Sequence, residues 1–192
     1  MITFISNITN KAEAAAARQL GADILCLTPT LPPSRQKGAV SLRESAKIAR
    51  TMAPTPILVE GFGDDPGLYM ELGSLSPDIV KMSADYRTNP NFYRVFKMSC
   101  PGVKLMQTVP AAAPDDIETA VQLAWNCDYL FLQDMKPAIA KQIIMAVGVP
   151  VVIDGTDLNT DIIKQLDPYG VRFSIQAEAT ALADLCSAVH LL

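Results

Sequence analysis

The chain has 192 residues, 49% of them hydrophobic, which predicts one globular domain and excludes a disordered or fibrous protein. The formal net charge is −4 and the pI is near 4.9, which argues against a nucleic-acid partner because nucleic acids favour a basic face. The sequence has no apolar run near 18 residues and no signal-peptide pattern, so we expect no membrane segment and a cytoplasmic location.

The first 21 residues predict a strand followed by a helix. Ile2 to Ile5 form a short apolar strand that ends at two polar residues. Asn10 is a good N-cap, with Glu13 at the capping-box position, and Gly21 is a typical residue after a helix. Strand, polar turn, helix and glycine make one βα unit.

The same unit recurs along the chain. Further strands are predicted at 24–27, 57–59, 78–82, 103–106, 129–132, 149–153 and 171–174. Helices are predicted at 41–52, from 64 onwards, and at 90–97, 114–125, 137–147, 161–166 and 178–191, and a Pro-rich loop at 28–38. The strands are continuous apolar runs, as in a parallel sheet that is buried on both faces. Eight units predict a compact single-domain (β/α)8 TIM barrel over residues 1–192.

Structural roles, rather than functional ones, are expected for the cysteines, two acidic pairs and several other residues. Four scattered cysteines predict buried reduced thiols and no zinc site, and no metal or cofactor is expected. The acidic pairs at 64–65 and 115–116 begin helices, where carboxylates favour the macrodipole. Trp125 and the methionines are expected in the core, and His190 is expected to be a tail residue.

In a barrel of this kind, the C-terminal ends of the strands carry the chemistry. These ends hold a ring of polar residues with carboxylates and a lysine, from which a general acid–base pair could come. Polar residues there also satisfy strand ends and helix caps in any barrel. The ring comprises Ser6, Asn7, Thr28, Glu60, Lys81, Ser83, Asp85, Gln107, Thr108, Gln133, Asp134, Asp154, Gly155, Thr156, Ser174 and Gln176.

Several stretches resemble phosphoribosylanthranilate isomerase, a barrel enzyme of tryptophan biosynthesis. Ile5-Ser6-Asn7-Ile8-Thr9 resembles that family's I-C-G-[IL]-T, and Ser34-Arg35 with Val40-Ser41 resembles its S-P-R-x-V-[ST] loop. Residues 149–159 and 168–178 resemble its last two strands and their turns. The stretches occur in the family's order across nearly the whole chain.

The resemblance implies a cofactor-free Amadori isomerisation of an aminoaldose phosphate to an aminoketose phosphate. The position of the family's general-base cysteine is Ser6, and Asn7 replaces the following glycine. The position of the general-acid aspartate is Gln133, followed by Asp134, and a phosphate-site glycine is Gln176.

An active member would use Asp134 as the acid. Ser6, or a displaced group such as Asp154 or Asp85, would relay the proton. Arg35 would hold the anthranilate carboxylate, and the substrate-binding set is Arg35, Asn7, Lys81, Asp85, Asp154, Gly155, Thr156 and Ser174. The partner would be a small phosphorylated substrate, and the protein would be a monomer or a homodimer.

Two other readings stay open. A related barrel could act on another small phosphorylated carbonyl compound through a Schiff base at Lys81 or Lys104, because a desolvated lysine is a nucleophile. A non-catalytic relative would bind a ligand or a partner protein without performing the reaction.

Overall fold

The computed structural model describes residues 1–30, 39–83, 91–156, 158–176 and 179–190. Within these residues the strands are β1 (Ile2–Ser6), β2 (Ile24–Thr30), β3 (Ala39–Ser41), β4 (Ile57–Gly61), β5 (Ile79–Met82), β6 (Lys104–Pro110), β7 (Tyr129–Gln133), β8 (Val151–Asp154) and β9 (Gly170–Ser174). The helices are α1 (Lys11–Gln19), α2 (Leu42–Met52), α3 (Pro66–Ser74), α4 (Asn91–Ser99), α5 (Asp115–Ala124), α6 (Pro137–Ala146), α7 (Thr160–Leu166) and α8 (Ala179–His190).

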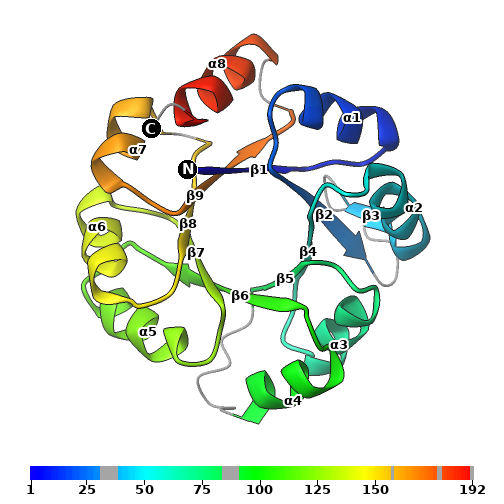
Figure 1. Ribbon diagram of the computed structural model, residues 1–192. Coiled ribbons are helices and arrows are strands. Elements are labelled where there is room, and N and C mark those ends of the chain that lie inside the picture. The colour runs from blue at the N-terminus through cyan, green and yellow to red at the C-terminus, as the bar shows by residue number, and fades with distance from the viewer. Residues whose placement is uncertain (31–38, 84–90, 157, 177–178, 191–192) are drawn as a thin grey trace.

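All the strand pairings are parallel, and eight of the strands close into a ring. The ring order is β1, β9, β8, β7, β6, β5, β4 and β2, and the β1–β2 pairing completes it. Figure 1 shows this ring with the helices around its outside. The predicted (β/α)8 TIM barrel is therefore confirmed, and the strand C-termini lie at one end, the barrel mouth.

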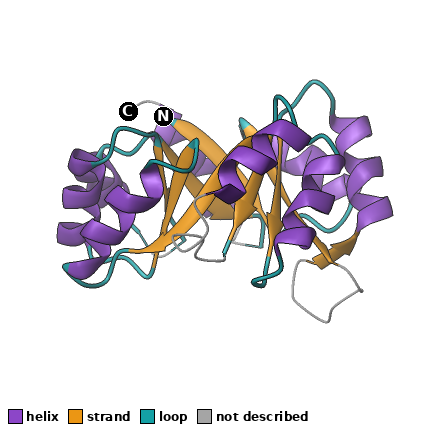
Figure 2. Ribbon diagram, turned by 90° about the horizontal axis from the view of Figure 1, so that it is seen from below, coloured by secondary structure: helices purple, strands orange, loops and turns teal. Residues whose placement is uncertain are grey.

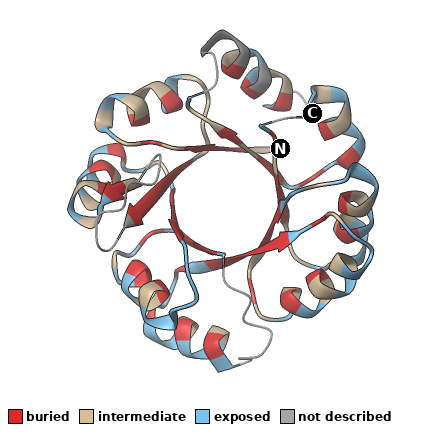
Figure 3. Cartoon of the chain, turned by 180° about the vertical axis from the view of Figure 1, so that it is seen from behind, coloured by how far each residue is buried: buried red, intermediate tan, exposed pale blue. Residues whose placement is uncertain are grey.

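In a side view, helices lie on the outside of the barrel strands (Figure 2). Their buried faces turn toward the strands and their exposed faces turn outward (Figure 3). The predicted N-caps Asn10 and Ser41 accept the backbone N–H groups of Glu13 and Glu44. In the described part of the chain, no helix is both long and apolar enough to cross a membrane.

Side chains alternate between the two faces of each strand. One set packs outward against the helices and forms the larger hydrophobic cluster. The other set fills the barrel interior with a floor of apolar side chains, namely Phe4, Cys26, Leu58, Ile79, Met106, Phe131 and Val152. The floor closes the lower barrel, and polar side chains such as those of Ser6, Lys81 and Gln133 line a cavity at the mouth above it.

Three aspartates connect neighbouring strands at the opposite end of the barrel. Each carboxylate accepts the backbone N–H of a residue on the preceding strand at 2.8 Å, and each aspartate N–H donates to that residue's carbonyl oxygen. The pairs are Asp23 with Thr3, Asp78 with Ile57, and Asp128 with Leu105. A sequence pattern of aspartate before an apolar strand thus has a structural cause that we did not predict.

The second strand is longer than predicted, and the assignment of 28–30 to a loop is wrong. Beyond Leu27, β2 leaves the ring and its residues Thr28 to Thr30 pair with β3, which was not predicted. Pro29 favoured a loop because proline cannot donate to a sheet. It is tolerated here because this end of β2 has only one strand neighbour.

Two interpretations of single residues are also wrong. Trp125 is 82% exposed at the end of α5 rather than in the core, and two methionines, Met98 and Met145, are exposed as well. His190 is not a free tail residue, because its Nε2 atom lies 3.0 Å from both Asp23 Oδ2 and Thr3 Oγ1. The four cysteines are buried and free, as predicted.

Candidate functional site

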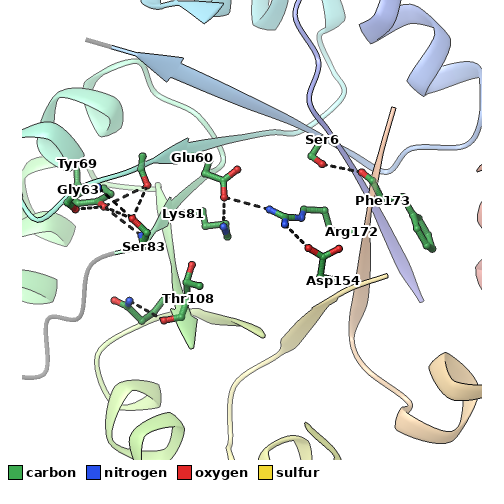
Figure 4. A network of polar contacts seen from close by, with 12 residues as sticks. Ser6, Glu60, Gly63, Tyr69, Lys81, Ser83, Thr108, Asp154, Arg172 and Phe173 are labelled. Atoms are coloured by element: carbon green, nitrogen blue, oxygen red, sulfur yellow. Dashed lines mark hydrogen bonds and ion pairs between the residues drawn. The ribbon is translucent and has the colours of Figure 1, made fainter. Parts of the chain in front are cut away.

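Four charged side chains lie above the apolar floor, in a network that crosses the barrel (Figure 4). Glu60 on β4 and Lys81 on β5 are register partners and form a salt bridge. Arg172 on β9 donates to Glu60 Oε1 at 3.3 Å through Nη1 and to Asp154 Oδ2 at 2.6 Å through Nη2. One oxygen of Glu60 therefore serves both cations, and Arg172 joins both carboxylates.

The network is buried to different depths. The side chains of Lys81 and Glu60 are 4% and 7% exposed, whereas those of Arg172 and Asp154 are 20% and 29% exposed. The ring of Phe131 lies below the two cations, with its centroid 4.3 Å from Lys81 Nζ and 4.2 Å from Arg172 Cζ. The floor thus contributes cation–π contacts as well as exclusion of water.

This environment shifts the pKa values of the network. Burial is the largest influence on Lys81 and lowers its pKa; Glu60 opposes this shift and the Arg172 guanidinium adds to it. Burial alone would raise the pKa of Asp154, but Arg172 and hydrogen bonds from Thr156 outweigh it and lower that pKa. Asp154 is therefore held as a carboxylate, and the charged form of Lys81 is disfavoured by its surroundings.

Two cavities open at the barrel mouth and share Gln133 and Arg172. The first has a volume of about 180 Å³ and is lined by Ser6, Asn7, Thr28, Glu60, Phe62, Lys81, Ser83, Gln133 and Arg172. The second has a volume of about 390 Å³ and is lined by Gln133, Asp134, Met135, Asp154, Thr156, Leu158 and Arg172. A larger cavity of about 460 Å³ lies outside the barrel between α2 and α3, away from this network.

Ser6 faces the first cavity but has no basic partner there. Its hydroxyl donates to the carbonyl oxygen of Phe173 at 3.0 Å, so its proton is directed to the backbone. No carboxylate or imidazole among the described residues contacts it. A serine hydroxyl needs such a base to accept or transfer a proton readily.

Asn7 follows Ser6 in a left-handed conformation, with φ of 63°. Its Nδ2 donates to Ser174 Oγ at 2.9 Å, and the backbone N–H of Gln176 donates to the same oxygen at 3.2 Å. Because this oxygen accepts twice, the hydroxyl proton of Ser174 is left to donate elsewhere. Ser174 can therefore offer a hydrogen bond to a bound anion.

Gln133 and Asp134 both reach the second cavity. Gln133 ends β7, and Asp134 has a positive φ of 50°, so the chain turns sharply directly after the strand. Consecutive strand residues point to opposite faces, and this turn brings the second residue back to the mouth. Asp134 and Asp154 therefore line the same cavity.

The turns after β8 and β9 are largely bonded within the protein. The backbone N–H groups of Gly155, Thr156 and Ile175 donate to Arg172 O, Asp154 Oδ1 and Ser6 O, respectively. A Cβ atom on Gly155 would lie 2.4 Å from Val171 Cγ1, so this glycine is required by packing. A phosphate at these turns would rely on the hydroxyl of Ser174 more than on backbone amides, because the Thr156 hydroxyl donates to Asp154 Oδ1 at 2.6 Å.

The remaining predicted residues fall into separate places. Arg35 and Asp85 lie outside the described residues. Lys104 begins β6 at the far end of the barrel, with a side chain that is 52% exposed and 3.9 Å from Asp128, so it is a salt-bridged surface lysine and the Schiff-base alternative does not apply to it. Arg172 was missed, although an arginine inside the apolar run 171–173 was the available signal.

No family model matches the sequence, and no curated protein matches it. Among solved structures, the phosphoribosylanthranilate isomerase of Thermotoga maritima superposes with a TM-score of 0.82 at 15% identity, with 100% of both chains covered. The isomerase of Thermus thermophilus gives 0.77 at 19% identity, covering 100% of this chain and 99% of that one. The tryptophan synthase α subunit of Legionella pneumophila gives 0.70 at 12%, covering 100% and 93%.

A further phosphoribosylanthranilate isomerase structure, with a TM-score of 0.82 and 15% identity, is a complex with reduced 1-(o-carboxyphenylamino)-1-deoxyribulose 5-phosphate. At identities this low, the similarity establishes the fold and leaves the chemistry to the side chains of this chain. The chain has the barrel fold of two kinds of tryptophan-biosynthesis protein.

Proposed function

We propose that this protein is a cofactor-free isomerase that rearranges an aminoaldose phosphate to an aminoketose phosphate at the barrel mouth. The observation that carries the proposal is the shared lining of the second cavity by Asp134 and Asp154. Two carboxylates on one cavity can act as the general acid and the general base that move a proton between two positions of a sugar. The resemblance and the fold similarity to phosphoribosylanthranilate isomerases support the same class of reaction.

The two carboxylates take different roles because their environments differ. Arg172 holds Asp154 in its ionised form, which is the state that accepts a proton from C2 of the substrate. Asp134 is exposed at the rim and donates a proton to the ring oxygen as the sugar ring opens. Asp154 therefore replaces Ser6 as the base, since the Ser6 hydroxyl is bonded to the backbone.

The remaining contacts would orient the substrate. The hydroxyl of Ser174, which accepts a hydrogen bond from Asn7, would donate its proton to a phosphate. The hydroxyl of Thr156 donates to Asp154 and helps to hold that carboxylate ionised. Arg35 would hold the carboxylate of an anthranilate group, as the resemblance implies. Gln133 lines both cavities and would hydrogen-bond a sugar hydroxyl.

Turnover of phosphoribosylanthranilate by the purified protein tests the proposal. We expect Asp154→Asn and Asp134→Asn each to lower kcat by about 100-fold or more, as for loss of a general acid or base. Asp161→Asn, an exposed carboxylate at the start of α7, is the matched control and should retain full activity. A tryptophan auxotroph that lacks the isomerase should be rescued by the wild-type gene and by the Asp161→Asn gene, but not by the Asp154→Asn or Asp134→Asn gene.

The result that overturns the proposal is folded wild-type protein without turnover. Calorimetry with the reduced product analogue then separates the other readings. Binding without turnover would indicate a ligand-binding relative, and no binding would point to a different substrate or a protein partner.

A further inference from the structure

We propose that the Lys81 amine is a nucleophile that forms an imine with a small aldehyde or ketone in the first mouth cavity. This activity goes beyond the proposed isomerisation, which uses Asp134 and Asp154 in the second cavity and leaves Lys81 and Glu60 without a chemical role. The two proposals therefore stand or fall separately.

The fold does not need a lysine at this position. Lys81 points into the barrel directly above an apolar floor, and its register partner on β6 is Met106, which is fully buried. A buried ion pair is commonly no more stable than apolar side chains of similar volume, because both ions lose their hydration. A buried lysine is therefore better explained by chemistry than by stability.

The surroundings of Lys81 favour the uncharged form of its amine more than the surroundings of a lysine in an ordinary salt bridge would. Lys81 shares its carboxylate oxygen, Glu60 Oε1, with Arg172, and both cations lie over the face of Phe131. A desolvated lysine beside a second, permanent cation is the arrangement that activates lysine as a nucleophile. Arg172 cannot lose its proton, so Lys81 is the member of the pair that can release one.

The amine has space for a reactant. Lys81, Glu60 and Arg172 line the first cavity together with the small polar side chains of Ser6 and Thr28. Its volume of about 180 Å³ equals that of about six water molecules at roughly 30 Å³ each. This space suits a carbonyl compound of two to four carbons. Arg172 would bind an anionic group of that compound by donating hydrogen bonds to it.

Glu60 completes the proton transfers. It takes one proton from the Lys81 ammonium group, and the free Nζ attacks the carbonyl carbon as the carbonyl electron pair moves to oxygen. A proton then passes from the nitrogen, which has become positively charged, to that oxygen and gives a neutral carbinolamine. The resulting carbinolamine loses its hydroxyl group as water, with the proton returned by Glu60. The balance is one ammonium and one carbonyl giving one protonated imine and one water, with no oxidant or cofactor.

Reductive trapping tests this inference on the wild-type protein. The protein is incubated with glycolaldehyde or pyruvate and sodium borohydride, and adducts are mapped by peptide mass spectrometry. We expect modification at Lys81 at least about tenfold faster than at Lys104, because the Lys81 side chain is 4% exposed beside Arg172 whereas that of Lys104 is 52% exposed. Lys104, exposed on another strand of the same barrel, is the internal comparison.

Variants separate a reactive site from non-specific labelling. Lys81→Met should abolish the fast adduct, and Lys104→Met should leave it unchanged. Glu60→Gln should slow its formation while the amine remains. If the Lys81→Met protein does not fold, the map of adducts on the wild-type protein still tests the inference. Folded wild-type protein that is labelled on surface lysines, with Lys81 unmodified, would overturn it. Loss of isomerase turnover in Asp154→Asn with Lys81 still labelled would show that the two activities are distinct.

Discussion

Arg172 and Glu60 are 112 residues apart in the sequence, and their side chains meet inside the barrel at 3.3 Å. Their strands, β9 and β4, are not neighbours in the ring, because β1 and β2 lie between them. The contact therefore exists only because the sheet closes. It links the buried Lys81–Glu60 pair to Asp154 and makes one continuous charge network of two cations and two carboxylates.

The first prediction concerns the stability of this network. Glu60→Gln removes the carboxylate that two buried cations share, so we expect a loss of about 3–5 kcal/mol in the free energy of unfolding. Combining it with Lys81→Met should cost less than the two single changes together, because no unpaired lysine remains. Urea unfolding of the single and double variants measures this coupling.

Glu44→Gln is the matched control for that series. Glu44 pairs with Lys47 on the surface of α2 at 3.5 Å, so its loss should change stability by only about 0–1 kcal/mol. Equal effects of Glu60→Gln and Glu44→Gln would contradict the buried network.

The second prediction concerns the packing of Gly155, which the sequence had suggested as a ligand-binding residue. Gly155→Ala places a Cβ atom 2.4 Å from Val171 Cγ1 and 2.6 Å from Phe173 Cε1, so we expect it to lower stability by about 1–3 kcal/mol. Gly148→Ala is the control, since its Cβ would meet no atom within 4 Å. Thermal unfolding measures both, and an unaffected Gly155→Ala protein would argue against the tight fit of this turn.

The third prediction is a pH dependence that involves Asp23. Burial raises its pKa, but the hydrogen bond from the Thr3 N–H and the contacts with His190 and the Thr3 hydroxyl outweigh burial and lower it. A lowered carboxyl pKa in the folded state stabilises the protein above the ordinary value of 3.8, and this stabilisation is lost as the pH falls through the lowered pKa.

Asp23→Asn should therefore destabilise the protein by about 1 kcal/mol at pH 7, and by less at about pH 3. Chemical unfolding at both pH values gives the comparison. Asp184→Asn, an exposed carboxylate on α8, should show no such difference. If the difference in the free energy of unfolding between wild type and Asp23→Asn increased on acidification, it would contradict a lowered pKa of Asp23.

The fourth prediction uses the single tryptophan of the chain. Because Trp125 is 82% exposed, its fluorescence in the native state should be quenched by acrylamide almost as well as that of the unfolded protein. Trp125→Ser should change the free energy of unfolding by less than about 0.5 kcal/mol. Strong protection from acrylamide would show that another surface covers this end of α5.

The sequence determined the barrel because its signals are local. Apolar runs such as 57–59 and 129–132, separated by capped helices, require a parallel sheet buried on both faces, and eight of them close on themselves. Asn10, Ser41 and Asp65 mark helix starts through contacts within three residues, which a sequence shows directly. The placement of Asp154 and Lys81 at one end followed from the fold alone.

Tertiary structure alone decided which of these groups act together. Nothing near Arg172 in the sequence indicates Glu60, since the closed ring brings the two together from strands that do not pair. The same closure buries Lys81 and leaves Lys104 exposed, although each of these lysines lies within an apolar run of the sequence. Asp134 reaches the mouth only through its positive φ, and Ser6 is bonded to the backbone of a strand 167 residues away. The sequence shows which chemical groups the side chains carry. Which groups contact one another, and how deeply each is buried, depends on contacts between strands that are distant in the sequence.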